Sequence, residues 1–145
     1  MKCLMDHIVL NVRDVEREVE FYTVVLGFAP ERLELYRAGK VPFPSVRINP
    51  DTIIDLFPES MWAGELHGEG SRTNLHHFCL SVRREDHERL FDRIVRLGVE
   101  IETGPVNRWG AHGTGISIYF RDPEMNLIEL RYYVNGNSGP CLLES

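Results

Sequence analysis

The amino-acid sequence predicts an α+β fold in which one βαβββ module is used twice. Two short apolar strands begin at His7 and His77, and a valine closes each strand five residues after its histidine. An amphipathic helix follows each strand and ends at a glycine, Gly27 or Gly98, 20 residues after the first histidine and 21 after the second. Repetition at so regular a spacing indicates a duplicated supersecondary unit. We therefore predict two matched modules that each present one histidine.

The first module is predicted to run strand, helix, strand, strand, strand. Residues 7–12 alternate with period two, as a strand does when only one of its faces is apolar. Asp14 suits the N-cap of the helix, whose apolar residues recur at helical spacing up to Gly27. Segment 36–44 is too rich in glycine and proline for a central strand. It is therefore predicted to be a loop between the strand that follows residue 28 and the strands at 45–48 and 52–57.

The second module is predicted to repeat this order. Residues 78–82 form a strand, and the helix that follows ends at Gly98. Residues 104–115 are predicted to be a flexible loop because they are rich in glycine. The remaining predicted strands are 99–102, 116–120 and 127–133, with a turn at 122–126. The chain is expected to form a single domain, with module 1 at 4–57, a linker at 58–73, module 2 at 74–133 and a loose tail at 134–145.

Composition excludes several classes of protein. Hydrophobic residues make up 43% of the chain and charged residues 26%, as in soluble globular proteins, and we expect a cytoplasmic location. No apolar run has the length of a membrane span, and no signal peptide is expected. The net charge of -6 comes without a basic run, which argues against a nucleic-acid partner. Cys3, Cys79 and Cys141 have neither disulfide nor zinc-finger spacing, and Cys79 is predicted to be a small buried hydrophobe.

Two histidines and two carboxylates have the spacing of a metal site. The last strand of each module carries one carboxylate between apolar residues, Asp55 in the first and Glu129 in the second. Such a carboxylate is costly to bury without a charged or metal partner. Strand parity places His7 and His77 on the faces opposite the larger aliphatic residues. We predict that the four side chains bind one divalent ion (Zn, Ni, Co, Mn or Fe), since the set is too nitrogen-rich for calcium and too hard for Cu(I).

Two of these assignments have alternatives. His76 is adjacent to His77, but parity turns its side chain to the other face of the strand. Asp55 is one methylene shorter than Glu129, so direct ligation, contact through a water molecule and a local hydrogen bond all stay open for it.

The substrate contacts predicted from the sequence are Arg131, Trp109 and His112. Arg131 shares strand parity with Glu129 and is expected to point the same way, toward an anionic substrate. Trp109 and His112 lie in the glycine-rich segment, which is expected to act as a lid. Three further arginines are weaker candidates, Arg47, Arg72 and Arg108.

These motifs resemble the vicinal oxygen chelate superfamily, which includes glyoxalase I, extradiol dioxygenases, methylmalonyl-CoA epimerase and bleomycin-binding proteins. The resembling segments span nearly the whole chain, and the last is the most specific: 6–12, 21–28, 75–82 and 118–130. The resemblance implies paired βαβββ modules that form a cupped mixed sheet around a metal, usually completed in a homodimer. It places His7, His77 and Glu129 on metal-ligand positions. Asp55 falls where glyoxalase I and the epimerase have a Glu or Gln ligand and the dioxygenases have none.

The resemblance also implies an activity. The leading expectation is a glyoxalase-like lyase or isomerase, in which the metal holds two neighbouring substrate oxygens and Glu129 or Asp55 moves a proton. An extradiol dioxygenase would use His7, His77 and Glu129 to hold Fe(II). An acyl-CoA epimerase and an antibiotic-binding protein are further alternatives. Binding proteins of this family commonly lack the ligands, so the presence of all four favours an enzyme.

Overall fold

The computed structural model describes residues 5, 7–63, 75, 77–110 and 112–134. The chain divides into two compact units, Met1–Arg72 and Thr73–Ser145. Most of the predicted linker and the predicted tail lie outside the described residues, so both stay predictions. Each unit contains one four-stranded mixed sheet, as the duplicated βαβββ pattern predicts.

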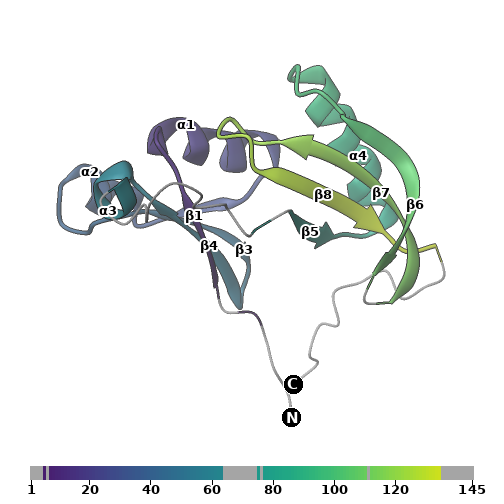
Figure 1. Cartoon of the computed structure of the whole chain (residues 1–145), viewed down its shortest axis with the longest axis horizontal. Coiled ribbons are helices and arrows are strands. Elements are labelled where there is room, and N and C mark those ends of the chain that lie inside the picture. Colours follow the sequence, from purple (N-terminus) through teal and green to yellow (C-terminus); the bar gives the residue numbers. More distant parts are fainter. Residues whose placement is uncertain (1–4, 6, 64–74, 76, 111, 135–145) are drawn as a thin grey trace, which may run out of the picture. The chain divides into compact units, whose positions relative to one another are not determined.

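The first sheet has the strand order β1-β4-β3-β2, with β1 parallel to β4 and the other pairs antiparallel. Figure 1 shows this sheet and the helices of the same unit. The strands are β1 (His7–Asn11), β2 (Ala29–Glu31), β3 (Ser45–Asn49) and β4 (Thr52–Phe57). The helices are α1 (Val15–Glu20), a π-helical turn (Phe21–Val25), α2 (Leu33–Arg37) and α3 (Glu59–Trp62).

The first helix begins and ends where the sequence predicts. The Asp14 side chain accepts a hydrogen bond from the backbone N–H of Arg17 at 3.1 Å, which confirms the predicted N-cap. The chain leaves the helix at Gly27, whose φ of 76° suits a residue without a side chain. The apolar stripe of the helix is buried together with the even-numbered residues of the sheet: Val15, Val19, Tyr22, Leu10, Val46, Ile54 and Leu56.

The second sheet has the strand order β5-β8-β7-β6, which repeats the topology of the first. Its strands are β5 (Phe78–Ser81), β6 (Thr103–Gly110), β7 (Gly113–Arg121) and β8 (Leu127–Tyr132). Figure 1 shows α4 (Arg84–Arg96) along one face of this sheet. Its core residues again have even numbers: Ile94, Ile118, Phe120, Ile128 and Leu130, all fully buried. On the strands, even-numbered side chains therefore face the core, and odd-numbered ones lie on the opposite face, which in the second sheet is mostly polar.

The register shows that the two units are equivalent residue by residue. In the first unit, the residue two positions after His7 pairs with Asp55 across β1 and β4. In the second unit, the residue two positions after His77 pairs with Glu129 across β5 and β8. Each carboxylate therefore occupies the same place relative to its histidine.

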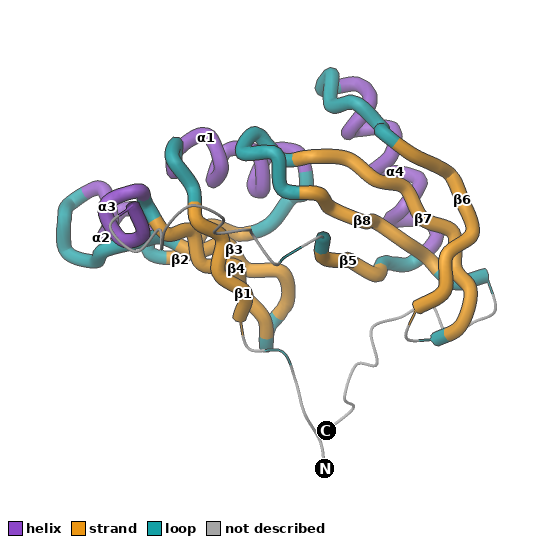
Figure 2. Tube along the Cα trace, viewed as in Figure 1, coloured by secondary structure: helices purple, strands orange, loops and turns teal. Residues whose placement is uncertain are grey.

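Two predictions for the segment after α4 are wrong. Residues 104–110 and 113–115, predicted to belong to a flexible loop, lie in β6 and β7, which pair as a hairpin and which Figure 2 colours as strand. Residues 99–102, predicted to be a strand, have no strand structure. Pairing with β7 outweighs the local preference of the glycines. Pro105 fits because the register shifts between Thr103 and Val106, and proline is tolerated at such irregularities.

Two short helices were not predicted from the sequence. α2 begins at Leu33, before the predicted loop at 36–44, and only its last two residues lie in that loop, while α3 lies at the start of the predicted linker. Trp62 anchors α3, because its indole N–H points to the backbone oxygens of Val12 and Phe57 at 3.3 and 3.1 Å. None of the helices described is long and apolar enough to cross a lipid bilayer.

Gly104 is the glycine whose replacement the hairpin should tolerate least. Its φ is 109°, and a Cβ there would lie 2.4 Å from the backbone oxygen of Ser117. We expect Gly104→Ala to lower the free energy of unfolding by about 3 kcal/mol, because strain and a backbone clash add together. Gly98→Ala is the matched control: φ is 77°, but a Cβ would meet nothing within 4 Å, and the expected loss is about 1 kcal/mol. Urea denaturation measures both, and equal losses would contradict the clash.

Candidate functional site

The polar face of the second sheet gathers side chains from three neighbouring strands. His77 directly precedes β5, Tyr119 lies on β7, and Glu129 and Arg131 lie on β8. Tyr119 pairs with Glu129 across β7 and β8, while Cys79 pairs with Glu129 from the other side. Glu129 is therefore at the centre of this face.

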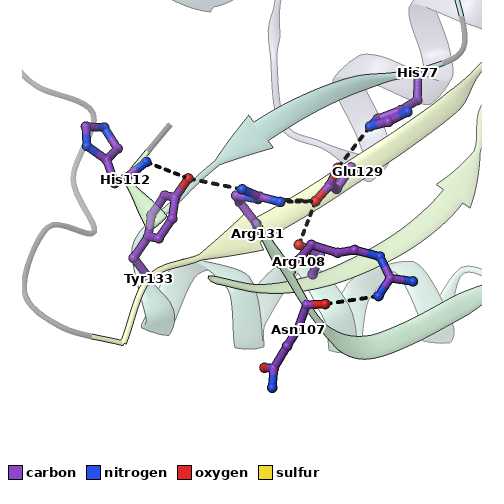
Figure 3. Close-up of polar contacts among 8 residues, drawn as sticks. His77, Asn107, Arg108, His112, Glu129, Arg131 and Tyr133 are labelled. Atoms are coloured by element: carbon purple, nitrogen blue, oxygen red, sulfur yellow. Dashed lines mark hydrogen bonds and ion pairs between the residues drawn. The ribbon is translucent and has the colours of Figure 1, made fainter. Parts of the chain in front are cut away.

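Glu129 is held by three side chains. His77 Nε2 lies 3.0 Å from one carboxylate oxygen, Oε2. The other oxygen, Oε1, accepts hydrogen bonds from Ser117 Oγ at 2.6 Å and from the Arg131 guanidinium at 2.6 and 3.2 Å. Figure 3 shows these contacts converging on the carboxylate. The Glu129 residue is only 3% exposed, so the carboxylate is ordered by its partners and not by bulk water.

These contacts keep Glu129 ionised. Burial alone would raise the pKa of Glu129, but the hydrogen bonds from Ser117 and Arg131 and the positive charge of Arg131 outweigh it, and the pKa is lowered. A carboxylate with a lowered pKa is a good metal ligand. It is a poor general base near neutral pH, because its affinity for a proton is reduced.

Arg131 lies on the predicted face, but its guanidinium binds other side chains of the protein. Its residue is 4% exposed, and its guanidinium binds both Glu129 and the Tyr133 hydroxyl, the latter at 3.1 Å. A guanidinium held in this way orients the carboxylate. Direct contact with a substrate stays a prediction for Arg131. The exposed Arg108, which lies on β6 with its guanidinium carbon 5.9 Å from the Tyr119 ring, is better placed to meet an anion.

Tyr119 is a site residue that the sequence reasoning missed. Its ring lies edge-on to His77 with centroids 5.8 Å apart. Desolvation and the negative charge of Glu129 raise the pKa of Tyr119, so the phenol stays protonated and can donate a hydrogen bond. Strand parity could have identified it, because Tyr119 has an odd number on the strand next to Glu129.

The two predicted lid residues belong to the β6–β7 hairpin. Trp109 lies near the end of β6, and His112 lies in the turn before β7. The backbone N–H of His112 donates to the Tyr133 hydroxyl at 3.3 Å, and the two rings meet edge-on at 5.4 Å. His112 is thereby tied to β8. The prediction that both residues contact a substrate is not tested by these contacts.

Cys79 is exposed, so the prediction of a small buried hydrophobe is wrong. The reason is parity: Cys79 lies between the apolar residues Phe78 and Leu80, but its side chain belongs to the polar face with His77. Desolvation of the thiol and the negative charge of Glu129 raise the pKa of Cys79 to about 12, although the residue as a whole is exposed. The thiol is therefore protonated at neutral pH and is a weak nucleophile.

In the first unit, Asp55 and His7 lie on the equivalent face. Asp55 is 8% exposed, and its Oδ1 accepts a hydrogen bond from Ser45 Oγ at 2.5 Å. The local hydrogen bond that was one alternative for Asp55 is therefore present. Arg47 binds Glu31 at 2.5 Å. Arg72 and His76 lie outside the described residues, as do Cys3 and Cys141.

The geometry of His77 and Glu129 fits part of a metal site. In an octahedral site, bonds of about 2.1 Å to nitrogen and oxygen that meet at a right angle leave the two ligand atoms about 3.0 Å apart. This is the separation of His77 Nε2 and Glu129 Oε2. Imidazole and carboxylate are also a donor pair that divalent first-row metals accept. Among the described residues, no three His, Cys, Asp or Glu side chains converge closely enough to hold an ion, so this pair needs further ligands.

The sequence profile of the Glyoxalase/Bleomycin resistance protein/Dioxygenase superfamily matches residues 4–130. The chain belongs to this superfamily. This confirms the resemblance and the predicted fold of two βαβββ modules. The family includes lyases and dioxygenases, so membership limits the set of possible reactions but does not select one of them.

Relatives of this superfamily member are similar over most of its length. Virulence protein STM3117 of Salmonella typhimurium is 34% identical over 134 residues, covering 90% of this chain and 84% of that protein. The crystal structure of STM3117 matches with a TM-score of 0.71 and 30% identity, over 92% of this chain and 99% of that one. A glyoxalase/dioxygenase from Nostoc punctiforme matches with a TM-score of 0.68 and 27% identity, over 88% and 89%. Catechol-2,3-dioxygenase of Bacillus subtilis is 29% identical over 126 residues, covering 83% of this chain and 38% of that protein.

The ion pair between Arg131 and Glu129 should make a large contribution to stability. We expect Arg131→Met to lower the free energy of unfolding by about 3–5 kcal/mol, because it leaves a buried carboxylate without its cation. Arg47→Met is the matched control: the Arg47–Glu31 pair is more exposed, with both side chains at 37%, and its loss should cost about 1 kcal/mol or less. Chemical denaturation measures both. Adding Glu129→Gln to Arg131→Met should recover part of the loss, and a strictly additive double variant would contradict the pairing.

Proposed function

We propose that this protein is a divalent-metal-dependent lyase or isomerase of the glyoxalase type, acting on a small substrate with two neighbouring oxygens. The proposed ligands are His7, His77, Glu129 and Asp55, the set predicted from the sequence. The observation that carries the proposal is the separation of 3.0 Å between His77 Nε2 and Glu129 Oε2, with the other Glu129 oxygen fixed by Ser117 and Arg131. We further propose that the protein works in the cytoplasm as a homodimer.

The residues of the second unit are suited to binding and orientation. When bound, the metal would act as a Lewis acid on the two substrate oxygens. Glu129 would serve mainly as a ligand, because Arg131 and Ser117 lower its pKa and occupy Oε1. Tyr119 stays protonated and would donate a hydrogen bond to negative charge that develops on a substrate oxygen. Arg108, Trp109 and His112 are the proposed substrate contacts on the hairpin.

Proton transfer is assigned to Asp55. In the described residues, its side chain accepts one hydrogen bond, from Ser45, and it has no cation of the kind that Arg131 provides for Glu129. Of the two predicted proton carriers, Asp55 therefore has fewer hydrogen-bond donors on its carboxylate. It would take a proton from a substrate carbon and return it to the neighbouring carbon.

A dioxygenase is the second candidate, and a specific observation favours it. The fixed and ionised Glu129 is what the carboxylate of a two-histidine, one-carboxylate iron site requires, and His7 and His77 would complete that set. Similarity to catechol-2,3-dioxygenase of Bacillus subtilis is in keeping with this chemistry. In this reading Asp55 takes no part in the reaction.

Metal content tests the proposed ligand set. Protein purified without chelators is expected to contain a divalent first-row metal in stoichiometric amount by elemental analysis. His77→Ala and Glu129→Gln should each lower the metal affinity by at least about 10-fold, the effect of disturbing a metal shell. Glu100→Gln, at an exposed carboxylate, is the control and should bind metal as the parent protein does. A parent protein that takes up none of these metals would overturn the proposal.

Asp55→Asn separates the two candidate reactions. If Asp55 carries the proton, this variant should lose about 10²–10⁴-fold in the rate of solvent deuterium incorporation into a hydroxyketone or hemithioacetal substrate, measured with metal added to saturation because Asp55 is also a proposed ligand. If the protein is a dioxygenase, Asp55→Asn should retain oxygen uptake with Fe(II) and a catechol. A parent protein with oxygen uptake but no deuterium exchange would refute the lyase or isomerase assignment.

A further inference from the structure

A chain of hydrogen bonds connects the turn of the β6–β7 hairpin to Glu129 (Figure 3). The backbone N–H of His112 donates to the Tyr133 hydroxyl at 3.3 Å, and Arg131 Nη1 donates to the same oxygen at 3.1 Å. Arg131 Nη2 donates to Glu129 Oε1 at 2.6 Å, and Glu129 Oε2 faces His77 Nε2 at 3.0 Å. Three links therefore join an exposed turn to Glu129, and a fourth joins Glu129 to His77.

The middle of this chain is buried and has little freedom to move. Tyr133, Arg131 and Glu129 are 5%, 4% and 3% exposed. The guanidinium is planar, so its contacts with Tyr133 on one side and Glu129 on the other fix its orientation together. The Arg131 guanidinium carbon also lies 5.6 Å from the Tyr133 ring centroid. A shift of the Tyr133 hydroxyl would therefore move Arg131, and Arg131 would move the carboxylate.

Tyr133 differs from its neighbour Tyr132 in the hydrogen bonds that its hydroxyl group accepts. Tyr132 lies on the opposite face of β8, where its ring meets His87 edge-on at 4.8 Å and the Arg84 guanidinium carbon lies 5.8 Å from the ring centroid. Both side chains offer an aromatic ring, but the Tyr133 hydroxyl is the group that accepts hydrogen bonds from both the hairpin and Arg131. Replacing either hydroxyl removes the same atom, which makes the two positions a matched pair.

We propose that Tyr133 is a positioning residue that couples the His112 turn to the Glu129 carboxylate through Arg131. The inference rests on the proposed function, since Glu129 matters to it as a metal ligand. Coupling is reciprocal in binding equilibria, so a ligand that orders the turn strengthens metal binding, and metal binding orders the turn. Through this chain of hydrogen bonds, the hairpin, where the substrate contacts are proposed, influences the proposed metal site.

Tyr133→Phe tests the coupling, with Tyr132→Phe as its control. Titration with Co(II), followed by calorimetry and visible absorption, should show affinity about 10–100-fold weaker for Tyr133→Phe and unchanged for Tyr132→Phe. Amide exchange at His112, measured by NMR, should slow when Co(II) or Zn(II) is added to the parent protein or to Tyr132→Phe. In Tyr133→Phe, metal should leave the exchange at His112 unchanged. Retention of both parent affinity and metal-dependent exchange in Tyr133→Phe would overturn the coupling.

A second measurement keeps this result separate from the metal assignment. In metal-free protein, Glu129→Gln removes the negative charge that Arg131 binds, and the altered Arg131 should change the exchange rate at His112. The double variant with Tyr133→Phe should show no such change relative to Tyr133→Phe alone. An unchanged rate in Glu129→Gln overturns the coupling whether or not the chain binds metal. Failure of the parent protein to bind any metal overturns the proposed function instead.

Discussion

The ion pair between Arg131 and Glu129 is the interaction on which the polar face of the second unit depends. A buried carboxylate without a cation is strongly destabilising, whereas a carboxylate paired with a guanidinium and a hydroxyl is satisfied. Glu129 has both partners, at 2.6 Å each. This leaves Oε2 directed at His77, and the same charge that stabilises the carboxylate lowers its pKa.

Strand parity explains how much of the site could be predicted. Period two in the sequence assigned His77, Glu129 and Arg131 to one face, and the structure places all three there. The same rule assigns Cys79 to the polar face, whereas the apolar residues on either side of it favour burial, and parity is the signal that holds. The equivalence of Asp55 and Glu129 also follows from spacing, and the register of both sheets shows it.

Strand pairing and the partners of individual side chains could not be predicted from the sequence. Glycine-rich residues 104–115 have a weak local preference for any structure, and they become a hairpin because β7 supplies a partner for every part of β6 except the irregularity after Thr103. The partners of Arg131 are likewise invisible in the sequence. Parity gives the direction of its side chain but does not reveal that Tyr133 and Glu129 accept hydrogen bonds from the guanidinium.

Duplication has left the two units alike in backbone and unlike in chemistry. The register makes Phe57 the counterpart of Arg131, since each lies two residues after its carboxylate. Phe57 packs on Phe43 with ring centroids 4.6 Å apart, where the other unit has a buried cation. At this position, one unit therefore holds a buried charge and the other packs an apolar ring. The substitutions that the two positions tolerate should therefore differ. Position 57 should accept other large apolar residues, whereas a change at position 131 should require a change at position 129 as well.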